Sequence, residues 1–348
     1  MTMRLFFLIN VSCLLLYVNA QAQSPPSVQI PPTDSIKTWM KQFNVSALGI
    51  GTIEQGKLKR VMVLGELKAG VAAPYNTIFD VASLTKSVTT QLTLRLVSEG
   101  KWSLDEPLYK YWVDPDVKND PRHKQLTTRH ILSHQSGFVN WRWMHKTKKL
   151  TFDFAPGTKV GYSGEGFHYL MRALEKKFKK SFQTLCDQYI FQPYKMADSH
   201  LTWRKGVDEN RFAIGHNQAG KPYKLEKNQK ASAADDLLTT IEDFGRFGVN
   251  VLAQKGVSQD AFREMVRPQG KVKPGVAFGL GWIVFDNLPN GEYALFNAGG
   301  DKGVAAVIVL LPKSKRGLII MANSEQRAIV MKMIVKSLDV GRTIMSRF

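Results

Sequence analysis

The sequence predicts an α+β fold in which strands from both ends of the chain form one antiparallel sheet. Strand-like patterns occupy residues 45–66 and much of residues 278–322, whereas helical patterns dominate between them. Such a sheet buries its faces against helices, and the middle of the chain is long enough to form a mostly helical insertion. We therefore expect an antiparallel sheet flanked by terminal helices, an inserted mostly helical domain, and a site where the two lobes meet.

The predicted fold divides the chain into four segments. Residues 1–22 have the features of a signal peptide, and residues 23–82 supply the N-terminal part of the sheet domain. Residues 83–235 form the mostly helical insertion. Residues 236–348 return to the sheet domain, because strand patterns resume there.

The first strands are predicted as a hairpin. Apolar and β-branched residues fill 45–53 and 58–64, and the turn 54–57 separates them. Residues 23–33 are rich in Pro, Ser and Gln, which predicts a flexible leader before the first strand.

Further elements follow from apolar spacing, capping residues and turns. One helix is predicted to begin after Ser83, and another has an apolar face that runs from Phe167 to Phe178. Further helices are predicted over 127–134, 182–192, 240–252 and 325–340. Strands are predicted over 278–286, 293–297, 304–311 and 317–322, with turns at 290–291 and 313–316, whereas 204–230 is polar and irregular.

Composition limits the class of protein. The 348 residues are 44% hydrophobic and 22% charged, which is typical of a globular chain. The net charge of +19 favours anionic surroundings. The basic residues are scattered apart from short clusters at 146–149 and 176–180, and no nucleic-acid motif accompanies them. We therefore expect no nucleic-acid partner, and an anionic envelope surface as a partner.

The first residues predict export. Arg4 is the only charge before an apolar run at 5–18, and Ala20-Gln21-Ala22 fits a cleavage site after either alanine. No later stretch is long and apolar enough to span a membrane. We expect a periplasmic or secreted protein, in which Cys186 is the one remaining cysteine and occupies a buried helix position.

The most informative pattern is Ser83 followed three residues later by Lys86. An apolar, strand-like approach ends at Ser83, and an amphipathic run begins at Leu84. Ser83 therefore starts a helix, with Lys86 one turn later on the same face. Backbone N–H groups at a helix start stabilise a developing oxyanion, and a desolvated amine can accept the serine proton.

The pattern has one alternative interpretation and one second copy in the chain. Ser83 could be an ordinary N-cap serine. A second copy of the spacing, Ser98 to Lys101, reads instead as a helix end, because Gly100 suits the C′ position.

Six stretches, in order, resemble the serine β-lactamase-like hydrolases, which include class C β-lactamases, low-molecular-weight penicillin-binding proteins and related esterases. The resemblance spans roughly residues 35–345. Ser83-x-x-Lys86 matches the acylating motif of these enzymes. The six stretches are 78–86, 96–107, 128–137, 156–163, 278–282 and 297–303.

The resemblance implies a β-lactamase/transpeptidase-like fold and an acyl-serine mechanism. Ser83 would attack a carbonyl, while Lys86 and Tyr162 take its proton and return it to the leaving group. The backbone N–H groups of Ser83 and Gly300 would form the oxyanion hole. Asn297 and Ser163 stand at substrate-binding positions, and no cofactor or metal is implied.

The chain departs from the family pattern at two positions. The second motif usually reads Tyr-x-Asn, and Gly164 replaces the Asn. The third usually begins with Lys or His, and here it begins with Asn297, which carries no charge. Lys302 is a candidate replacement for the missing cation. Both changes weaken β-lactam hydrolysis and carboxylate recognition more than they weaken acyl transfer from esters or amides.

Two other catalytic patterns fail. His130 and His134 have a metal-compatible spacing, but Ile131 stands where the zincin pattern requires Glu. We expect His134 to bond to backbone instead. Residues 161–165 nearly match a nucleophile elbow, but Glu165 replaces its second Gly.

Three functions remain open. The favoured one is an exported serine hydrolase acting on a small ester, amide or D-amino-acid peptide. The second is a true β-lactamase or D,D-carboxypeptidase, and the third is a non-catalytic envelope-binding protein that retains the fold. Specificity lies in loops such as 138–153 and 204–230, where Trp141 and Trp143 are candidates for a pocket rim.

Overall fold

The computed structural model describes residues 27–68, 70–203 and 207–348. The predicted signal peptide, residues 1–22, lies outside them. Within them, no helix combines the length and the apolar character that crossing a membrane requires.

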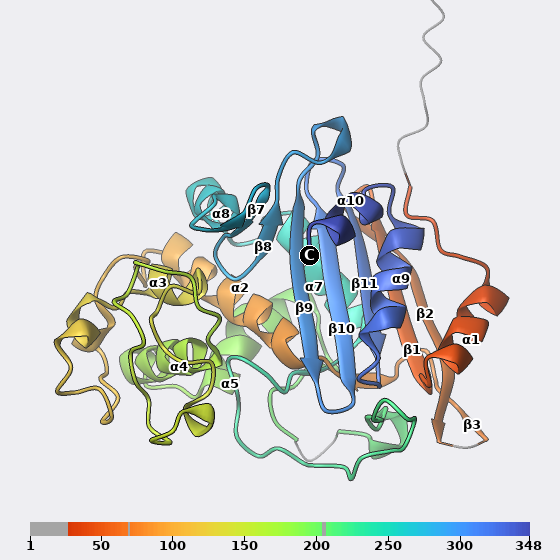
Figure 1. The fold of residues 1–348 in the computed structure, drawn as a ribbon, viewed down its shortest axis with the longest axis horizontal. Helices are drawn as coiled ribbons and strands as arrows, with labels where there is room; N and C mark the ends of the chain where they lie inside the picture. Colours follow the sequence, from red (N-terminus) through yellow and green to blue (C-terminus); the bar gives the residue numbers. More distant parts are fainter. Residues whose placement is uncertain (1–26, 69, 204–206) are drawn as a thin grey trace, which may run out of the picture.

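A nine-stranded sheet joins the two ends of the chain (Figure 1). Its order is β3-β2-β1-β11-β10-β9-β8-β7-β6, and every neighbouring pair is antiparallel. The strands are β1 Ala47–Glu54, β2 Lys57–Lys68, β3 Val71–Ala72, β6 Gly270–Lys273, β7 Val276–Phe278, β8 Ile283–Phe285, β9 Ala294–Asp301, β10 Val304–Leu311 and β11 Arg316–Ala322. Ile50 of β1 pairs with Met62 on one side and Ile320 on the other, so the terminal segments meet at β1.

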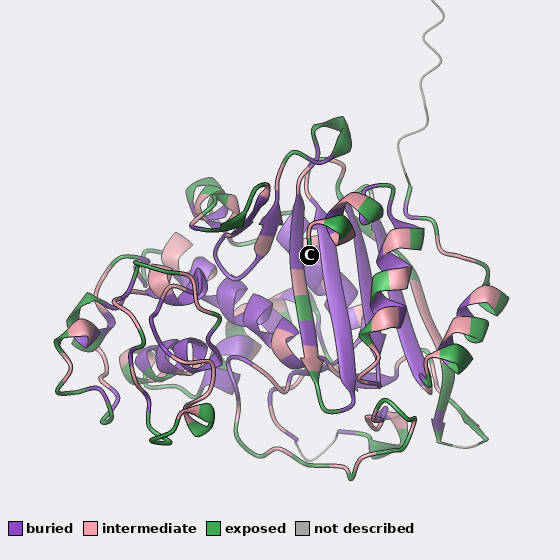
Figure 2. Ribbon diagram, viewed as in Figure 1, coloured by how far each residue is buried: buried purple, intermediate pink, exposed green. Residues whose placement is uncertain are grey.

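Helices cover both faces of the sheet, and two apolar clusters fill the spaces between the layers. One face carries α1 Thr33–Gln42, α9 Arg327–Ser337 and α10 Gly341–Ser346, and the other carries α7 Ile241–Leu252. Strands β10 and β11 are buried along their whole length, as Figure 2 shows. A strand covered on both faces reads as a continuous apolar run, which explains the composition of β10.

The remaining helices form the inserted region beside β9 and β8 (Figure 1). They are α2 Thr85–Ser98, α3 Thr128–Leu132, α4 Gly164–Phe178, α5 Phe182–Cys186, a π-turn Asp187–Phe191 and α6 Gln192–Tyr194. Helix α8, Gln259–Val266, follows α7 in the chain and packs against α2. Short 3₁₀ turns occur at η1 Ala82–Leu84, η2 Leu108–Lys110, η3 Pro121–Gln125, η4 Arg142–Met144, η6 Glu209–Arg211 and η7 Pro289–Gly291. Strand β4, Ile78–Asp80, pairs with β5, Leu238–Thr240, in a separate two-stranded sheet.

Helix α2 lies at the centre of this region and is buried on nearly all sides. Its threonines tolerate burial because their hydroxyls donate to carbonyls one turn earlier, as Thr90 does to Lys86 at 2.8 Å and Thr93 to Thr89 at 2.8 Å. Burial of a polar group costs little free energy once it is hydrogen-bonded. Helix α2, which carries Lys86, is therefore packed against neighbouring segments on nearly all sides.

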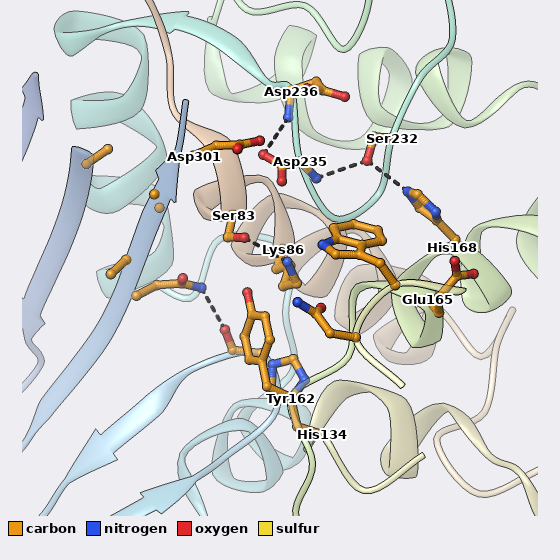
Figure 3. Close-up of a pocket in the computed structure, with 18 of the residues that line it drawn as sticks. Ser83, Lys86, His134, Tyr162, Glu165, His168, Ser232, Asp235, Asp236 and Asp301 are labelled. Carbon is orange, nitrogen blue, oxygen red and sulfur yellow. Dashed lines mark hydrogen bonds between the residues drawn. The ribbon is translucent and has the colours of Figure 1, made fainter. Parts of the chain in front are cut away.

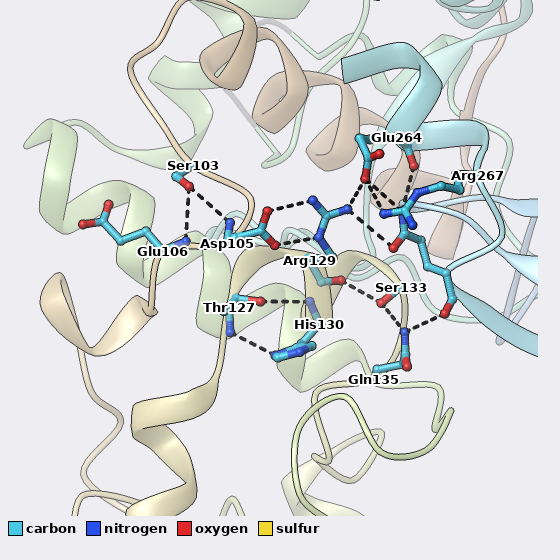
Figure 4. A network of polar contacts seen from close by, with 11 residues as sticks. Ser103, Asp105, Glu106, Thr127, Arg129, His130, Ser133, Gln135, Glu264 and Arg267 are labelled. Carbon is cyan, nitrogen blue, oxygen red and sulfur yellow. Dashed lines mark hydrogen bonds and ion pairs between the residues drawn. The ribbon is translucent and has the colours of Figure 1, made fainter. Parts of the chain in front are cut away.

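Arg129 ties α3 to α8 (Figure 4). Its guanidinium donates to both carboxylate oxygens of Asp105, at 2.6 and 2.7 Å, and contacts Glu264 of α8. The bidentate contact lowers the pKa of the Asp105 carboxyl. Three residues beyond the end of α3, Gln135 donates to Ser133 and to the Gln269 carbonyl. This network fixes the segment that leads to His134.

The structure confirms the α+β class, the hairpin at 45–64, the helix capped by Thr240 and the buried position of Cys186. The single strand predicted over 278–286 is wrong. It is divided into β7 and β8, because Gly281 adopts a φ of +69° and its N–H bonds to Leu132 instead of a strand. The final helix is divided at Leu338, whose backbone is extended.

The helices α1 and α8 and the short strands β3, β5 and β6 were not predicted.

Candidate active site

A cavity of about 1190 Å³ lies where β9 meets the inserted helices. Segments distant in sequence line it, namely the η1–α2 start, the loop before α4, the loop before β5, strand β9 and the start of α9. The Ser83 and Lys86 side chains both face this cavity (Figure 3). The predicted meeting point of two lobes is thus a cavity that contains the Ser-x-x-Lys pair.

The Lys86 ammonium lies 2.9 Å from the Ser83 hydroxyl oxygen. It also donates to the Ala234 carbonyl at 2.8 Å, and the side chain is only 2% exposed. The Tyr162 ring centroid lies 4.8 Å away, so an aromatic face covers another side of the ammonium. Two fixed partners hold the amine in place beside the hydroxyl.

Local backbone geometry presents Ser83 to the cavity. Ala82 adopts a φ of +46°, and its N–H donates to the Asp80 carboxylate at 2.8 Å. Ser83 lies in η1, one turn before the α-helix proper, which begins at Thr85. Among the described residues, the Ser83 N–H donates to no other group. It is therefore available to an oxygen in the cavity.

Strand β9 approaches Ser83 because Gly299 has no side chain. A Cβ on Gly299 would lie 2.0 Å from the Val81 carbonyl oxygen and 3.2 Å from the Ser83 nitrogen. This close approach requires glycine and puts the β9 backbone beside the Ser83 N–H. Gly300, the next residue, lines the cavity as well. The two predicted oxyanion donors thus belong to adjacent segments of backbone.

Tyr162 points toward the Ser83–Lys86 pair in Figure 3. Its ring stacks on the His134 imidazole, with centroids 4.4 Å apart and an interplanar angle of 29°. Burial, and then the charge of Lys86, lower the pKa of His134 to about 3, so this imidazole is neutral near pH 7. Its Nδ1 accepts the Ser163 N–H at 3.2 Å, which confirms the expected bond to backbone. His134 therefore positions Tyr162 without carrying charge.

The structure assigns Ser163 a different role from the predicted substrate contact. Its hydroxyl accepts the Gly166 N–H at 3.0 Å and donates to the Val139 carbonyl at 2.8 Å. The side chain is buried at the N-cap of α4 and does not line the cavity. Both bonds anchor the helix that follows Tyr162, so the hydroxyl is already occupied.

Trp141 fills the space beside Gly164. A Cβ on Gly164 would lie 2.4 Å from the Cη2 atom of the indole, so no side chain fits there without movement of the ring. The Gly164 N–H donates to the Asn140 side-chain oxygen at 2.9 Å, and both Asn140 and Trp141 line the cavity. The departure at position 164 is therefore coupled to the loop at 140–141. Trp143 lines the cavity too, as predicted for a rim residue.

Asn297 lines the cavity from β9, but its amide nitrogen donates to the Gly281 carbonyl at 2.9 Å. Its side-chain oxygen is left as an acceptor. Lys302 does not replace the missing cation, because it is exposed at the β9–β10 turn and does not line the cavity. The cations that do line the cavity include Arg327 of α9, whose guanidinium lies over Gly300.

A loop before β5 supplies the carbonyl that binds Lys86. The Ser232 hydroxyl accepts the backbone N–H groups of Ala234 and Asp235 at 3.2 and 3.0 Å, which closes a tight turn. The His168 Nε2 lies 2.9 Å from the same hydroxyl. Burial lowers the pKa of His168 to about 4, so this ring is neutral as well. The turn fixes the Ala234 carbonyl against Lys86.

Three carboxylates, Asp235, Asp236 and Asp301, line one side of the cavity (Figure 3). Burial, and then the neighbouring Asp236, raise the pKa of Asp235 to about 7, although Lys86 opposes the shift. Burial and Asp301 raise the pKa of Asp236. Like charges at short range disfavour ionisation of both members of a pair. The three side chains form a carboxylate wall, in which Asp235 changes its charge near neutral pH.

The sequence did not reveal this carboxylate wall, Ser232, His168 or Asn140 as parts of the site. None belongs to a short motif, and the segments that carry them are separated by many residues. The one local signal is the adjacent pair Asp235-Asp236 just before a strand.

A family model described as Beta-lactamase matches residues 36–334, and the chain belongs to that family. In the solved structures, the chain is similar to the octameric penicillin-binding protein homologue from Pyrococcus abyssi, with a TM-score of 0.73 and 20% identity. That match covers 88% of this chain and 78% of the other. The likeness confirms the β-lactamase/transpeptidase-like fold.

Two relatives illustrate the similarity. The chain is 32% identical over 142 residues to the probable fimbrial assembly protein FimD, serogroup H1, of Dichelobacter nodosus, and the match covers 36% of each chain. It is 24% identical over 295 residues to the D-alanyl-D-alanine-carboxypeptidase/endopeptidase AmpH of Escherichia coli (strain K12), covering 74% of each. The chain thus spans about a third of the length of the fimbrial assembly relatives.

Proposed function

We propose that this chain is an exported serine hydrolase that forms an acyl-enzyme on Ser83 and acts on an ester, an amide or a D-amino-acid peptide. The observation that carries the proposal is the 2.9 Å contact between the Lys86 ammonium and the Ser83 hydroxyl. A serine hydroxyl becomes a useful nucleophile only when a neighbouring base takes its proton. Lys86, in its deprotonated form, is within reach to do so.

The first half of the reaction transfers the acyl group. The Ser83 oxygen bonds to the substrate carbonyl carbon while its proton passes to Lys86. The carbonyl oxygen becomes an oxyanion, which the Ser83 N–H and the β9 backbone at Gly300 are positioned to stabilise. The bond to the leaving group then breaks, and the leaving group takes the proton from Lys86, with Tyr162 at the same face of the cavity.

The second half releases the product. A water molecule attacks the acyl carbon and gives one proton to Lys86. The ester bond to Ser83 breaks, the carboxylic acid leaves, and the proton returns to the serine oxygen. The atoms and charges balance without a cofactor or a metal.

The departures at Gly164 and Asn297 bear on the substrate class. Asn297 offers a neutral acceptor to the cavity, and the indole of Trp141 occupies the space beside Gly164. A substrate carboxylate would also face the carboxylate wall of Asp235, Asp236 and Asp301. These features favour small esters, amides and peptides over penicillins.

Intact-mass analysis after reaction with a fluorophosphonate probe tests the proposal. We expect one adduct on the wild-type protein and none on Ser83→Ala. A second incubation with a penicillin distinguishes the hydrolase from a β-lactamase or D,D-peptidase, which would form an adduct or turn the penicillin over. If neither reagent labels Ser83, the proposal is wrong and a non-catalytic binding protein becomes the better interpretation.

Export is proposed on the signal-like residues 1–22. Expression in a Gram-negative host followed by fractionation and N-terminal sequencing tests it. We expect a periplasmic or secreted product that begins after Ala20 or Ala22. A cytoplasmic product with an intact N-terminus would contradict export without affecting the chemistry.

A further inference from the structure

The segment at residues 143–149, which we call the tip loop, displays two large apolar side chains to solvent. Trp143 is 63% exposed and Met144 is 61% exposed. A lone exposed apolar residue is ordinary, but adjacent exposed Trp and Met side chains at the mouth of a cavity indicate a contact surface.

The base of the tip loop is firmly held. The Arg142 guanidinium forms ion pairs with Asp114 at 2.8 Å, Asp116 at 3.1 Å and Glu165 at 2.9 Å. At the other end, the Leu150 N–H donates to Asp116 at 2.9 Å, and the Leu150 side chain is buried. Because both ends are anchored in the inserted region, the apolar side chains are presented by a fixed platform.

The tip loop is strongly basic. Lys146, Lys148 and Lys149 are all exposed, and none of them pairs with a carboxylate within the described part of the chain. The Lys148 ammonium donates to the backbone carbonyl of Trp143 at 2.6 Å, so it is held beside the backbone that carries the apolar pair. The positive charge of Arg142, at the base of the loop, is already neutralised by the three carboxylates with which it forms ion pairs. The positive charge of the loop therefore belongs to its solvent-exposed end.

This combination of residues fits a membrane surface better than a protein partner. Stable protein interfaces bury about 800 Å² on each side, which is more than two apolar side chains supply. Tryptophan favours the boundary between headgroups and acyl chains. Lysine is attracted to anionic headgroups. A few inserted side chains and several lysines are enough for reversible binding to a bilayer.

We propose that the tip loop docks onto an anionic phospholipid bilayer. Trp143 and Met144 enter the headgroup boundary, and the three lysines bind lipid phosphates. Because Trp143 also lines the cavity that contains Ser83, docking brings the mouth of the cavity to the membrane surface. The proposal concerns binding and holds whether or not Ser83 is acylated.

Co-sedimentation with vesicles tests the proposal. One preparation is phosphatidylcholine alone, and the other contains one third phosphatidylglycerol. We expect wild-type protein to bind only the anionic vesicles and to dissociate as salt is raised. Replacing Lys146, Lys148 and Lys149 with Gln should weaken binding on the order of a hundredfold, at about fivefold per lysine. Met144→Ser should weaken it at least about threefold.

A matched variant controls for total charge. Lys176, Lys179 and Lys180 are exposed at the far end of α4, about 20 Å along the helix, and have no adjacent exposed apolar pair. Their triple replacement by Gln removes the same charge and should weaken binding less than tenfold. If both triple variants lose equal affinity, binding reflects net charge alone and the docking assignment is wrong.

A probe at the tip tests insertion directly. Cys186 is fully buried, so in a Cys13→Ser background a Met144→Cys variant takes an environment-sensitive thiol dye at one accessible site. We expect a blue shift with anionic vesicles and none with neutral vesicles. An unchanged spectrum on bound protein would overturn the insertion of Met144. A shift with soluble protein or peptide alone, and none with vesicles, would overturn the bilayer as the partner.

Discussion

The indole of Trp141 lies so close to Gly164 that a Cβ at position 164 would be 2.4 Å from the Cη2 atom of the ring. Trp141 belongs to the loop before α4, and Gly164 is the first residue of that helix. The two residues therefore depend on one another. A larger residue at 164 requires the ring to leave, and the ring requires glycine.

The first prediction follows from this contact. Gly164→Ala should destabilise the protein by about 1–3 kcal/mol, because overpacking outweighs the usual gain from alanine in a helix. The double variant Trp141→Ala/Gly164→Ala should lose less than the sum of the two single changes. Urea unfolding of the four proteins gives the coupling free energy. Strict additivity would show that the cost of Gly164→Ala does not arise from the Trp141 ring.

Lys86 gives a second prediction. Lys86→Met keeps the volume of the side chain but removes the amine, so hydrolysis should fall by on the order of a thousandfold while the far-ultraviolet circular dichroism stays unchanged. The matched control is Lys177→Met, since Lys177 also packs on aromatic rings, those of Trp102 and Tyr111, outside the cavity. Equal activity of Lys86→Met and wild type would exclude Lys86 as the base.

Ser163 gives a third prediction, which separates a helix cap from a substrate contact. Ser163→Ala removes the hydroxyl that binds the Gly166 N–H and the Val139 carbonyl. The free energy of unfolding should fall by about 1–2 kcal/mol. The KM of a small ester should change less than threefold at a temperature where the variant is folded. A large rise in KM with unchanged stability would restore the substrate-binding assignment.

Asp235 gives a fourth prediction, which concerns pH. Burial and Asp236 raise its pKa from 3.8 to about 7, so the folded protein favours the protonated form. Stability from this group is complete below the unfolded pKa and declines as the pH rises from about 4 to about 7, because the unfolded chain releases the proton first. Asp235→Asn removes this loss.

Unfolding measurements at pH 5 and pH 8 check the sign. Relative to wild type, Asp235→Asn should gain about 2–3 kcal/mol more at pH 8 than at pH 5. Asp153→Asn, at an exposed position on the surface, is the control and should show no such difference. An identical pH dependence in wild type and Asp235→Asn would contradict the raised pKa.

Most of the fold was accessible from local patterns. The hairpin of β1 and β2, strand β10 and the capped helix α7 each carry their signal within about a dozen residues. The errors occur where that signal is short or where a distant contact overrides it. Strands β7 and β8 are separated at Gly281 because the glycine N–H bonds to the Leu132 carbonyl, about 150 positions away in the chain.

In the candidate active site, too, some features follow from the local sequence and others only from contacts between distant segments. Sequence alone determined the spacing of Ser83 and Lys86, because three residues at the start of a helix put two side chains on one face wherever the helix lies. Tertiary structure alone decided that Ala234 holds the Lys86 ammonium, that Trp141 fills the space beside Gly164, and that Gly281 binds the amide of Asn297. These contacts join segments distant in the chain, and packing of whole elements sets their geometry.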